Sequence, residues 1–366
     1  MEDFITVNVK NAAPYDILIR NGYSGLKEKM AEAFSRKSKV CIIADRNVSD
    51  IYGNELISEL KGTFSAVDLI PLNLGETNKN LNTVSDCYSF LTEHRYNRKD
   101  VIAALGGGIC GDTAGFVAST YMRGLDFVQL PTTLLSMVDS SSGGKTGVNF
   151  KDYKNMVGAF KMPSLVYINT ATLNTLAPKE YASGMAEVLK AGLIRDGVFY
   201  EWLINNFSEI NDRDPDIIAE MLYRSINIKR MFVEKDPFEK NERAILNFGH
   251  TIGHALEKYT NFEYSHGQCV ALGSVAAAYI SWKKEYLSAE EYYEIRDMFV
   301  PFDLPISLQD IDIDKVLEYT RSDKKNNEGR IRFILLKKIG KGIISDDVTE
   351  EEIKEAVRQI NFDPND

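Results

Sequence analysis

The order of apolar and polar residues predicts different elements in the two halves of the chain. In the first half, seven short apolar runs have strand-like composition: Phe4–Val9, Tyr15–Ile19, Val40–Ala44, Phe64–Ile70, Val101–Leu105, Phe127–Leu130 and Leu165–Ile168. Between some of them, stretches such as Glu55–Leu60 and Leu81–Leu91 repeat apolar residues at the spacing of one helix face. Because strands that alternate with helices are typical of parallel sheets, we expect a mostly parallel α/β domain.

The second half has mainly helical periodicity. Helix-like runs lie at Lys179–Leu193, Asp216–Met231 and Ala244–Tyr259, whereas a strand is indicated at Ile331–Leu336. Thr349 and Glu352 form a capping-box pattern that predicts a last helix over Glu350–Ile360. We place the domain boundary near residues 170–178. The expected organisation is an α/β domain over 1–175 and a mainly helical domain over 176–366.

Composition and charge narrow the class of protein. The chain has 366 residues and a formal net charge of -10, which argues against a nucleic-acid or membrane-surface partner because both attract basic faces. The longest nearly apolar run, Cys269–Trp282, is too short to span a bilayer and predicts a buried helix. The four cysteines are widely separated, which is typical of reduced thiols. We therefore expect a cytoplasmic protein.

A glycine-rich segment follows the strand-like run Val101–Leu105. Its sequence, GGGICGD over 106–112, leads into an apolar helical stretch. Glycines at such a turn let backbone N–H groups approach a pyrophosphate, but they also permit tight packing alone. Asp45, at the end of another strand, could accept hydrogen bonds from a ribose or simply cap a turn. Both interpretations stay open for both features.

Three of the four histidines, His250, His254 and His266, lie within 17 residues. His250 and His254 are four residues apart in a helical pattern and share a face. Imidazoles in such a cluster are typical zinc ligands, although histidines packed at a helix turn are the alternative. The metallopeptidase motif H-E-x-x-H is absent, since Thr251 occupies the position of its glutamate. Glu187, in an apolar segment, is a candidate third ligand because a buried carboxylate needs a partner.

Cationic residues lie in segments rich in Gly, Ser or Asn. They are Arg123, Lys145, Lys154, Lys190, Lys229 and Arg243. Singly, each is most simply a solvated surface charge. As a set beside glycine turns they favour an anionic substrate. The segment SSSGGKT over 140–146 lacks the spacing of an ATP-binding P-loop.

Many motifs in order resemble those of the 3-dehydroquinate synthase family, from about residue 40 to Gly340. They are GGGICGD (106–112), YMRG (121–124), PTTLLSMVDSSSGGKTGVN (131–149), KNMVG (154–158), GMAEVLK (184–190), LNFGHTIGH (246–254), SHG (265–267) and DKKN (323–326). The resemblance implies a Rossmann-like N-terminal domain that binds NAD and a helical C-terminal domain that binds a metal ion. It also implies a homodimer in which Arg123 reaches the partner's site.

The resemblance also implies a role for individual residues. Glu187, His250 and His266 would bind Zn²⁺ or Co²⁺, and His254 would be the acid/base, with Glu239, Lys190 and Lys229 as further catalytic candidates. NAD would contact Asp45, Glu76, Lys79, Gly107, Gly108, Asp112, Thr132, Thr133, Asp139, Lys145, Lys154, Thr172 and Thr175. The substrate would contact Arg123, Lys145, Asn155, Lys190, Lys229, Arg243, Asn247 and Lys324. Asn169 and Ala171 depart from aspartates common in the family, next to the expected adenosine contacts.

The implied activity is that of a lyase of the shikimate pathway. It converts 3-deoxy-D-arabino-heptulosonate 7-phosphate to 3-dehydroquinate and phosphate, by transient oxidation, elimination, re-reduction and aldol closure, with NAD regenerated in each turnover. Another sugar-phosphate cyclase is the nearest alternative. A metal-dependent polyol dehydrogenase and a non-catalytic NAD-binding protein are further alternatives. The first would not need so many anion-binding residues, and the second would not need a complete metal site.

Overall fold

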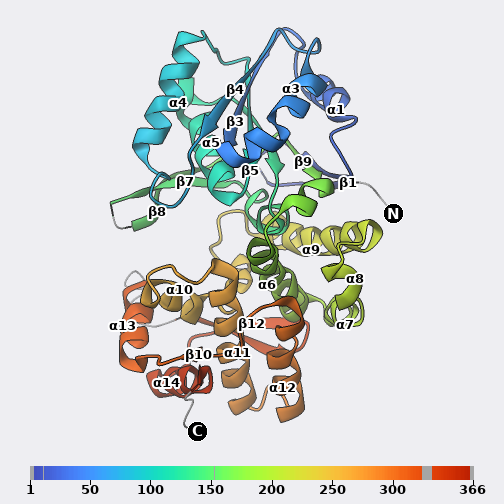
Figure 1. Ribbon diagram of the computed structural model, residues 1–366. Helices are drawn as coiled ribbons and strands as arrows, with labels where there is room; N and C mark the ends of the chain where they lie inside the picture. The colour runs from blue at the N-terminus through green and yellow to red at the C-terminus, as the bar shows by residue number, and fades with distance from the viewer. Residues whose placement is uncertain (1–3, 11, 152, 324–331, 363–366) are drawn as a thin grey trace. The chain divides into compact units, whose positions relative to one another are not determined.

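The computed structural model describes residues 4–10, 12–151, 153–323 and 332–362, which form two compact units (Figure 1). Unit 1 comprises residues 1–176 together with 218–238, and unit 2 comprises 177–217 together with 239–366. The first boundary lies inside the expected 170–178 interval. The segment 218–238, however, belongs to unit 1, so the units are not the two continuous segments 1–175 and 176–366 that the pattern led us to expect.

Unit 1 is built on a seven-stranded sheet in the order β1-β2-β9-β6-β5-β3-β4. The strands are β1 (Phe4–Val7), β2 (Tyr15–Arg20), β3 (Lys39–Asp45), β4 (Ala66–Leu72), β5 (Val101–Gly106), β6 (Asp126–Pro131) and β9 (Leu165–Asn169). All neighbours pair in parallel except β1 and β2. The mostly parallel α/β sheet is therefore confirmed. All seven predicted strands are present, with β4 displaced by two residues.

Helices cover both faces of this sheet (Figure 1). The main ones are α1 (Leu26–Ala33), α3 (Asn54–Leu60), α4 (Leu81–Glu93) and α5 (Gly108–Thr120). Alternate residues of a strand point to opposite faces, so Ile42 packs in one core with α1 and α3, whereas Ile43 packs in the other with α4 and α5. The near-continuous apolar runs in the sequence reflect this burial on both sides.

The strand order reverses between β3 and β5. From β3 the chain continues to β4 on one side, and from β5 it continues to β6 on the other. The carboxyl ends of these two strands, at Asp45 and Gly106, are consequently neighbours at a topological switch point. Ligands of doubly wound sheets bind at such points. The fold therefore places both nucleotide-site candidates at the expected edge of the sheet.

Shorter elements complete unit 1. They are α2 (Arg46–Val48), η1 (Ser49–Gly53), η2 (Tyr121–Arg123), η3 (Ser136–Ser140), η4 (Thr170–Thr175), the antiparallel hairpin of β7 (Lys145–Phe150) with β8 (Tyr153–Phe160), and most of α9 (Pro215–Lys235). The hairpin packs on α5. It has no counterpart among the predicted strands.

Unit 2 is mainly helical, as expected. Its elements are α6 (Pro178–Arg195), α7 (Gly197–Asn205), α8 (Phe207–Asn211), η5 (Glu242–Asn247), α10 (His250–Tyr259), α11 (His266–Lys283), α12 (Ala289–Asp297), η6 (Val300–Phe302), α13 (Ile313–Asp323), α14 (Glu350–Gln359), the hairpin of β11 (Phe333–Lys338) with β12 (Lys341–Ser345), and the pair β10 (Leu308–Gln309) and β13 (Asn361–Phe362). The predicted capping box of α14 is present, with reciprocal hydrogen bonds between Thr349 and Glu352.

One predicted helix is wrong in its extent. The run Ala244–Tyr259 is not continuous, because η5 ends at Asn247 and α10 starts at His250. Gly249 between them has a φ of 78°, in the left-handed region that glycine adopts at low cost. The break places His250 at the first turn of a new helix.

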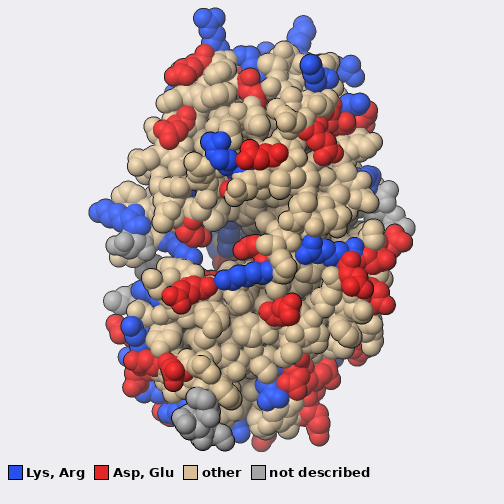
Figure 2. Space-filling model, in the orientation of Figure 1, with Lys and Arg blue, Asp and Glu red and all other residues tan. Residues whose placement is uncertain are grey.

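The surface and the cysteines agree with the composition. Acidic and basic side chains of the described residues are interspersed on the face drawn in Figure 2. All four cysteines are buried thiols. Within the described part of the chain, every helix is too short or too polar to pass through a lipid bilayer.

Candidate metal centre and nucleotide-binding loop

Close helix contacts bring the metal candidates of unit 2 together. The first turn of α11 touches α6, where the Gly267 N–H donates to Ser183 Oγ at 3.0 Å. A Cβ on Gly267 would lie 2.2 Å from the Ser183 carbonyl oxygen, so only glycine permits this approach. Ser183 is one helical turn before Glu187. The contact therefore places His266, the residue before Gly267, next to Glu187.

A second glycine contact sets the position of α10 on α11. A Cβ on Gly273 would lie 2.0 Å from the Gly249 carbonyl oxygen, and one on Gly253 would lie 2.9 Å from the Cys269 carbonyl oxygen. The two backbones therefore approach closely at the start of α10. This crossing brings His250 to the same place as His266.

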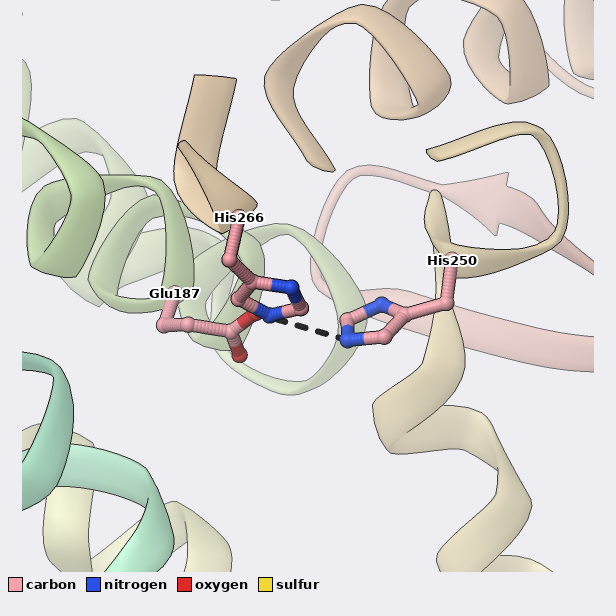
Figure 3. A group of neighbouring side chains, drawn as sticks. All are labelled: Glu187, His250 and His266. Carbon is pink, nitrogen blue, oxygen red and sulfur yellow. Dashed lines mark ion pairs between the residues drawn. The ribbon is translucent and has the colours of Figure 1, made fainter. Parts of the chain in front are cut away.

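The result is a cluster of one carboxylate and two imidazoles (Figure 3). Glu187 Oε1 lies 3.6 Å from His250 Nε2 and 3.5 Å from His266 Nε2. Glu187 is only 4% exposed, and its Oε1 has no hydrogen-bond partner among the residues that the structure describes. A buried carboxylate oxygen without a partner is costly, so the cluster requires a positive centre.

The other ring nitrogens indicate what that centre is. His250 Nδ1 lies 3.1 Å from the Phe248 carbonyl oxygen, and His266 Nδ1 lies 2.6 Å from Glu257 Oε1. Because both partners are acceptors, we assign the proton of each neutral ring to Nδ1. Each Nε2 then presents a lone pair toward Glu187 Oε1. Three acceptors that converge in this way, without a donor between them, could hold a metal ion.

The charges around the cluster are strongly coupled. Burial raises the pKa of Glu187, but Lys190, which pairs with its Oε2, and the two imidazoles hold that pKa well below its usual range. Burial and Lys190 lower the pKa of His250 to about 3. Burial also opposes the charge on His266, yet Glu187 and Glu257 outweigh it and raise its pKa to about 10.

His254 lies beside this cluster. Its ring centroid is 5.1 Å from that of His250 and 6.2 Å from that of His266, and the residue is exposed. His254, Glu257 and His266 form a second group whose ligand atoms lie within 4.8 Å of one another. The position of His254 is therefore compatible either with a metal ligand or with an acid/base. Its acid/base role stays a prediction.

The other predicted residues of unit 2 fall on neighbouring elements. Lys190 and Arg243 are each 3% exposed. Asn247 donates from Nδ2 to Glu239 Oε1 at 2.7 Å, so the acid/base candidate Glu239 is held by a substrate-binding candidate. Lys324 lies outside the described residues.

In unit 1 the glycine loop is closely packed. Added Cβ atoms on Gly106, Gly107 and Gly108 would lie 2.7 Å from Cys110 Cβ, 3.1 Å from Thr133 Cγ2 and 2.9 Å from Ser140 Oγ. The tight-packing interpretation is therefore correct. It is compatible with the phosphate interpretation, because the loop leads into the N-terminus of α5 at Gly108. Similarly, Asp45 caps α2 by accepting from the Asn47 N–H at 3.0 Å.

Several predicted NAD contacts form a hydrogen-bonded network. The buried Lys79 Nζ lies 2.6 Å from Asp112 Oδ2 and 2.5 Å from Asn155 Oδ1. Glu76 Oε2 accepts from Asn149 Nδ2 at 2.9 Å, and Glu76 Oε1 lies 3.8 Å from Lys154 Nζ. These contacts join the loop before α4 to the β7–β8 hairpin.

The remaining candidates of unit 1 lie on α9, on the short helices η2, η3 and η4, on β7, and directly after β6. Lys229 of α9 pairs with Asp139 Oδ1 of η3 at 2.5 Å. In η4, Thr172 is buried and Thr175 Oγ1 lies 2.6 Å from Tyr52 OH. Thr132, which follows β6, is buried, whereas Lys145 of β7 is exposed, as is Arg123 of η2, whose φ is 69°.

The departure at Asn169 has a structural counterpart. Its Oδ1 accepts from the Gly22 N–H at 2.7 Å and from the Ala171 N–H at 3.0 Å. The side chain therefore caps η4 and ties the end of β9 to the loop after β2. An amide oxygen provides this acceptor without the charge of an aspartate.

Sequence reasoning missed two contributors to the metal candidate cluster. One is Glu257, and the other is the carbonyl group of Phe248. A usable signal existed for Glu257, since it stands three residues after His254, directly after the apolar pair Ala255 and Leu256. A backbone carbonyl leaves no such signal.

Solved structures share this fold and define the class. One is 2-epi-5-epi-valiolone synthase from Streptomyces hygroscopicus subsp. jinggangensis 5008 with NAD⁺ and Zn²⁺ bound, which is 26% identical with a TM-score of 0.88 over 97% of this chain and 98% of that chain. Another is 2-deoxy-scyllo-inosose synthase complexed with carbaglucose-6-phosphate, NAD⁺ and Co²⁺, at 25% identity and a TM-score of 0.86 over 97% and 99%. The fold is that of this class of NAD- and metal-binding cyclising synthases.

Sequence comparison identifies the family within that class. The profile of the 3-dehydroquinate synthase N-terminal region matches residues 69–183, and that of the C-terminal region matches residues 184–326. A 3-dehydroquinate synthase from Ruminiclostridium cellulolyticum is 40% identical over 335 residues, which cover 92% of this chain and 93% of that protein. The chain belongs to the 3-dehydroquinate synthase family.

Proposed function

We propose that this chain is a 3-dehydroquinate synthase, a lyase that converts 3-deoxy-D-arabino-heptulosonate 7-phosphate to 3-dehydroquinate and phosphate. The observation that carries the proposal is the 40% identity to a synthase of that name over 92% of the chain. The carboxylate–imidazole cluster and the glycine loop support it, because the reaction needs redox chemistry at a carbinol carbon. The product places the enzyme in the shikimate pathway.

We infer that Glu187, His250 and His266 hold Zn²⁺ or Co²⁺ and that unit 1 holds NAD. The unpartnered Glu187 Oε1 between two imidazole nitrogens fits a divalent cation, which these three residues would hold. Gly107, Gly108, Asp45 and Asp112 at the switch point fit a dinucleotide. When bound, the metal ion would polarise the carbinol oxygen, and the nicotinamide would take up and return a hydride.

The side chains of the protein supply binding and proton transfer. His254 is an exposed imidazole beside the cluster, a position from which it is suited to transfer protons to or from a bound substrate. Buried Lys190 and Arg243 are suited to a carboxylate or phosphate, because burial strengthens their interaction with an anion. The proposed substrate contacts are Arg123, Lys145, Asn155, Lys190, Lys229, Arg243, Asn247 and Lys324, with Glu239 as a further acid/base.

We further propose that the enzyme is a cytoplasmic homodimer in which Arg123 serves the site of the partner. Arg123 is exposed in a turn whose preceding residue, Met122, also has a positive φ of 48°. Non-glycine residues hold such backbone conformations at a cost and concentrate at functional loops. The exposure of Arg123 in this turn supports a role at a partner's site.

The test is an assay of the purified protein with the heptulosonate phosphate and less than one equivalent of NAD⁺ per substrate. We expect phosphate and 3-dehydroquinate in amounts that exceed the NAD⁺ supplied, because the hydride returns in each turnover. Accumulation of NADH without phosphate release would instead identify a polyol dehydrogenase. Phosphate release from glucose 6-phosphate, but not from the heptulosonate phosphate, would identify another cyclase.

A further inference from the structure

A buried carboxylate behind the metal candidate cluster has no role in the proposed reaction. Glu257 lies on α10, is 7% exposed, and its Oε1 lies 2.6 Å from His266 Nδ1. Removal of a carboxylate from water is expensive unless charged or strongly polar partners compensate. The short contact with the imidazole is such compensation, so the placement of Glu257 and the orientation of His266 depend on each other.

The backbone of His266 is already fixed by other contacts. Ser265 and Gln268 form a capping box at the start of α11, and the Gly267 N–H is bound to Ser183 Oγ. What these contacts leave undetermined is rotation about the side-chain bonds of His266 and the choice of tautomer. An acceptor at Nδ1 determines both, because it holds the ring in one plane and keeps the proton on Nδ1.

We propose that Glu257 is a positioning residue that aims His266 Nε2 at the metal ion and increases the basicity of that nitrogen. This inference rests on the proposed metal centre of Glu187, His250 and His266. The corresponding acceptor for His250 is the neutral carbonyl of Phe248, at 3.1 Å. The two histidines therefore differ. His266 has the charged partner and the shorter hydrogen bond, so its Nε2 is the stronger electron-pair donor to the metal ion.

The alternative is that Glu257 binds a metal ion itself. It belongs with His254 and His266 to a group whose ligand atoms lie within 4.8 Å. Binding there would use His266 Nδ1, the atom that is engaged at 2.6 Å with the carboxylate. The existing hydrogen bond would have to break and Nδ1 would have to lose its proton. The geometry therefore favours one metal ion per chain, with Glu257 outside its ligand set.

The test compares metal affinity in metal-free full-length variants, by chelator competition with Zn²⁺ and by the visible absorption of bound Co²⁺. Glu257→Leu removes the acceptor, so we expect roughly 10–100-fold weaker Zn²⁺ binding and an altered Co²⁺ spectrum. Glu257→Gln keeps an acceptor oxygen of the same shape, and we expect it to recover part of that loss. Glu263 is an exposed carboxylate four residues after the end of α10 at Tyr259. Glu263→Gln is therefore the charge control, and it should bind Zn²⁺ as the wild type does.

The possible outcomes distinguish failure of the positioning role of Glu257 from failure of the proposed metal centre. Zn²⁺ affinity of Glu257→Leu within threefold of the wild type, measured while the wild type binds one equivalent, overturns the positioning role. Two equivalents in the wild type and one in the Leu variant overturn it in favour of a ligand role. A wild type that binds no metal overturns the proposed centre itself. If Glu257→Leu does not fold, Glu257→Asp withdraws the carboxylate by one methylene and should also weaken binding.

Discussion

Partner atoms decide the chemistry of the histidines in unit 2. The sequence does not distinguish the roles of His250, His254 and His266, but the fold gives their rings different surroundings. His250 and His266 each direct Nε2 at Glu187 Oε1 and have an acceptor at Nδ1, whereas His254 is exposed. The proximity of the histidines could be predicted from their spacing. The role of each ring nitrogen depends on atoms that the fold brings close, which the spacing does not show.

A ligand substitution should remove the metal and the activity together. Replacement of His266 by Ala leaves one carboxylate and one imidazole, which are too few to hold Zn²⁺ tightly in water. We expect the purified His266→Ala protein to contain well below one equivalent of metal and to release phosphate at background rates. His94→Ala, which alters an exposed histidine of unit 1, is the control and should keep both. Full activity of a metal-free enzyme would contradict the assignment.

Substitution of His254 should separate metal binding from turnover. If its imidazole transfers protons and is not a ligand, His254→Ala should keep about one equivalent of metal per chain. Its kcat should fall by roughly 100-fold or more, the usual effect of losing a general acid/base. Metal analysis and phosphate release measured on the same sample check both parts. Loss of the metal in this variant would show that His254 is a ligand.

At the level of elements, the pattern predicted the sheet well because burial on both faces leaves a strong local signal. The β7–β8 hairpin was missed because its strands are only partly buried and carry mixed polar residues. The run Ala244–Tyr259 was predicted as one helix because its apolar spacing continues across Gly249. What interrupts it is the contact of Gly249 with α11, a tertiary effect that periodicity within one segment cannot show.

This helix crossing gives a prediction about Gly273. Ala is normally favoured over Gly in a helix by about 1 kcal/mol, but a Cβ here would meet the Gly249 carbonyl oxygen at 2.0 Å. Since the obstacle is backbone, Gly273→Ala should lower the free energy of unfolding by about 1–3 kcal/mol, as overpacking does. Urea denaturation checks this. Gly75→Ala, with no neighbouring atom within 4 Å, is the control. An unchanged midpoint for Gly273→Ala would refute the steric argument.

The same substitution should also weaken metal binding. The crossing sets the distance between His250 and His266, so separation of α10 from α11 would pull the two Nε2 atoms apart. Dialysed Gly273→Ala should therefore retain less Zn²⁺ than Gly75→Ala at equal chelator concentration. Equal retention in the two variants would mean that the cluster does not depend on this contact.

At the scale of the whole molecule, the homodimer proposal predicts complementation between two inactive variants. If Arg123 serves the partner's site, a dimer of one Arg123→Ala chain and one His254→Ala chain has one site with both lesions and one with neither. Random pairing of equal amounts makes about half of the dimers mixed, so roughly a quarter of wild-type activity should return. Phosphate release after verified subunit exchange is the measurement. No recovery after exchange would mean that Arg123 acts within its own chain or not at all.

The discontinuous make-up of unit 1 has a consequence for synthesis on the ribosome. The chain leaves unit 1 after residue 176, re-enters it at 218 and leaves again after 238, so unit 1 is complete only 62 residues after residue 176 (238 minus 176). At about 5–20 residues per second, that delay is roughly 3 to 12 s. During this interval Asp139 has no Lys229, and unit 1 lacks the buried residues of α9, among them Ile226 and Phe232. The nascent chain therefore carries an incomplete first unit until residue 238 has been synthesised.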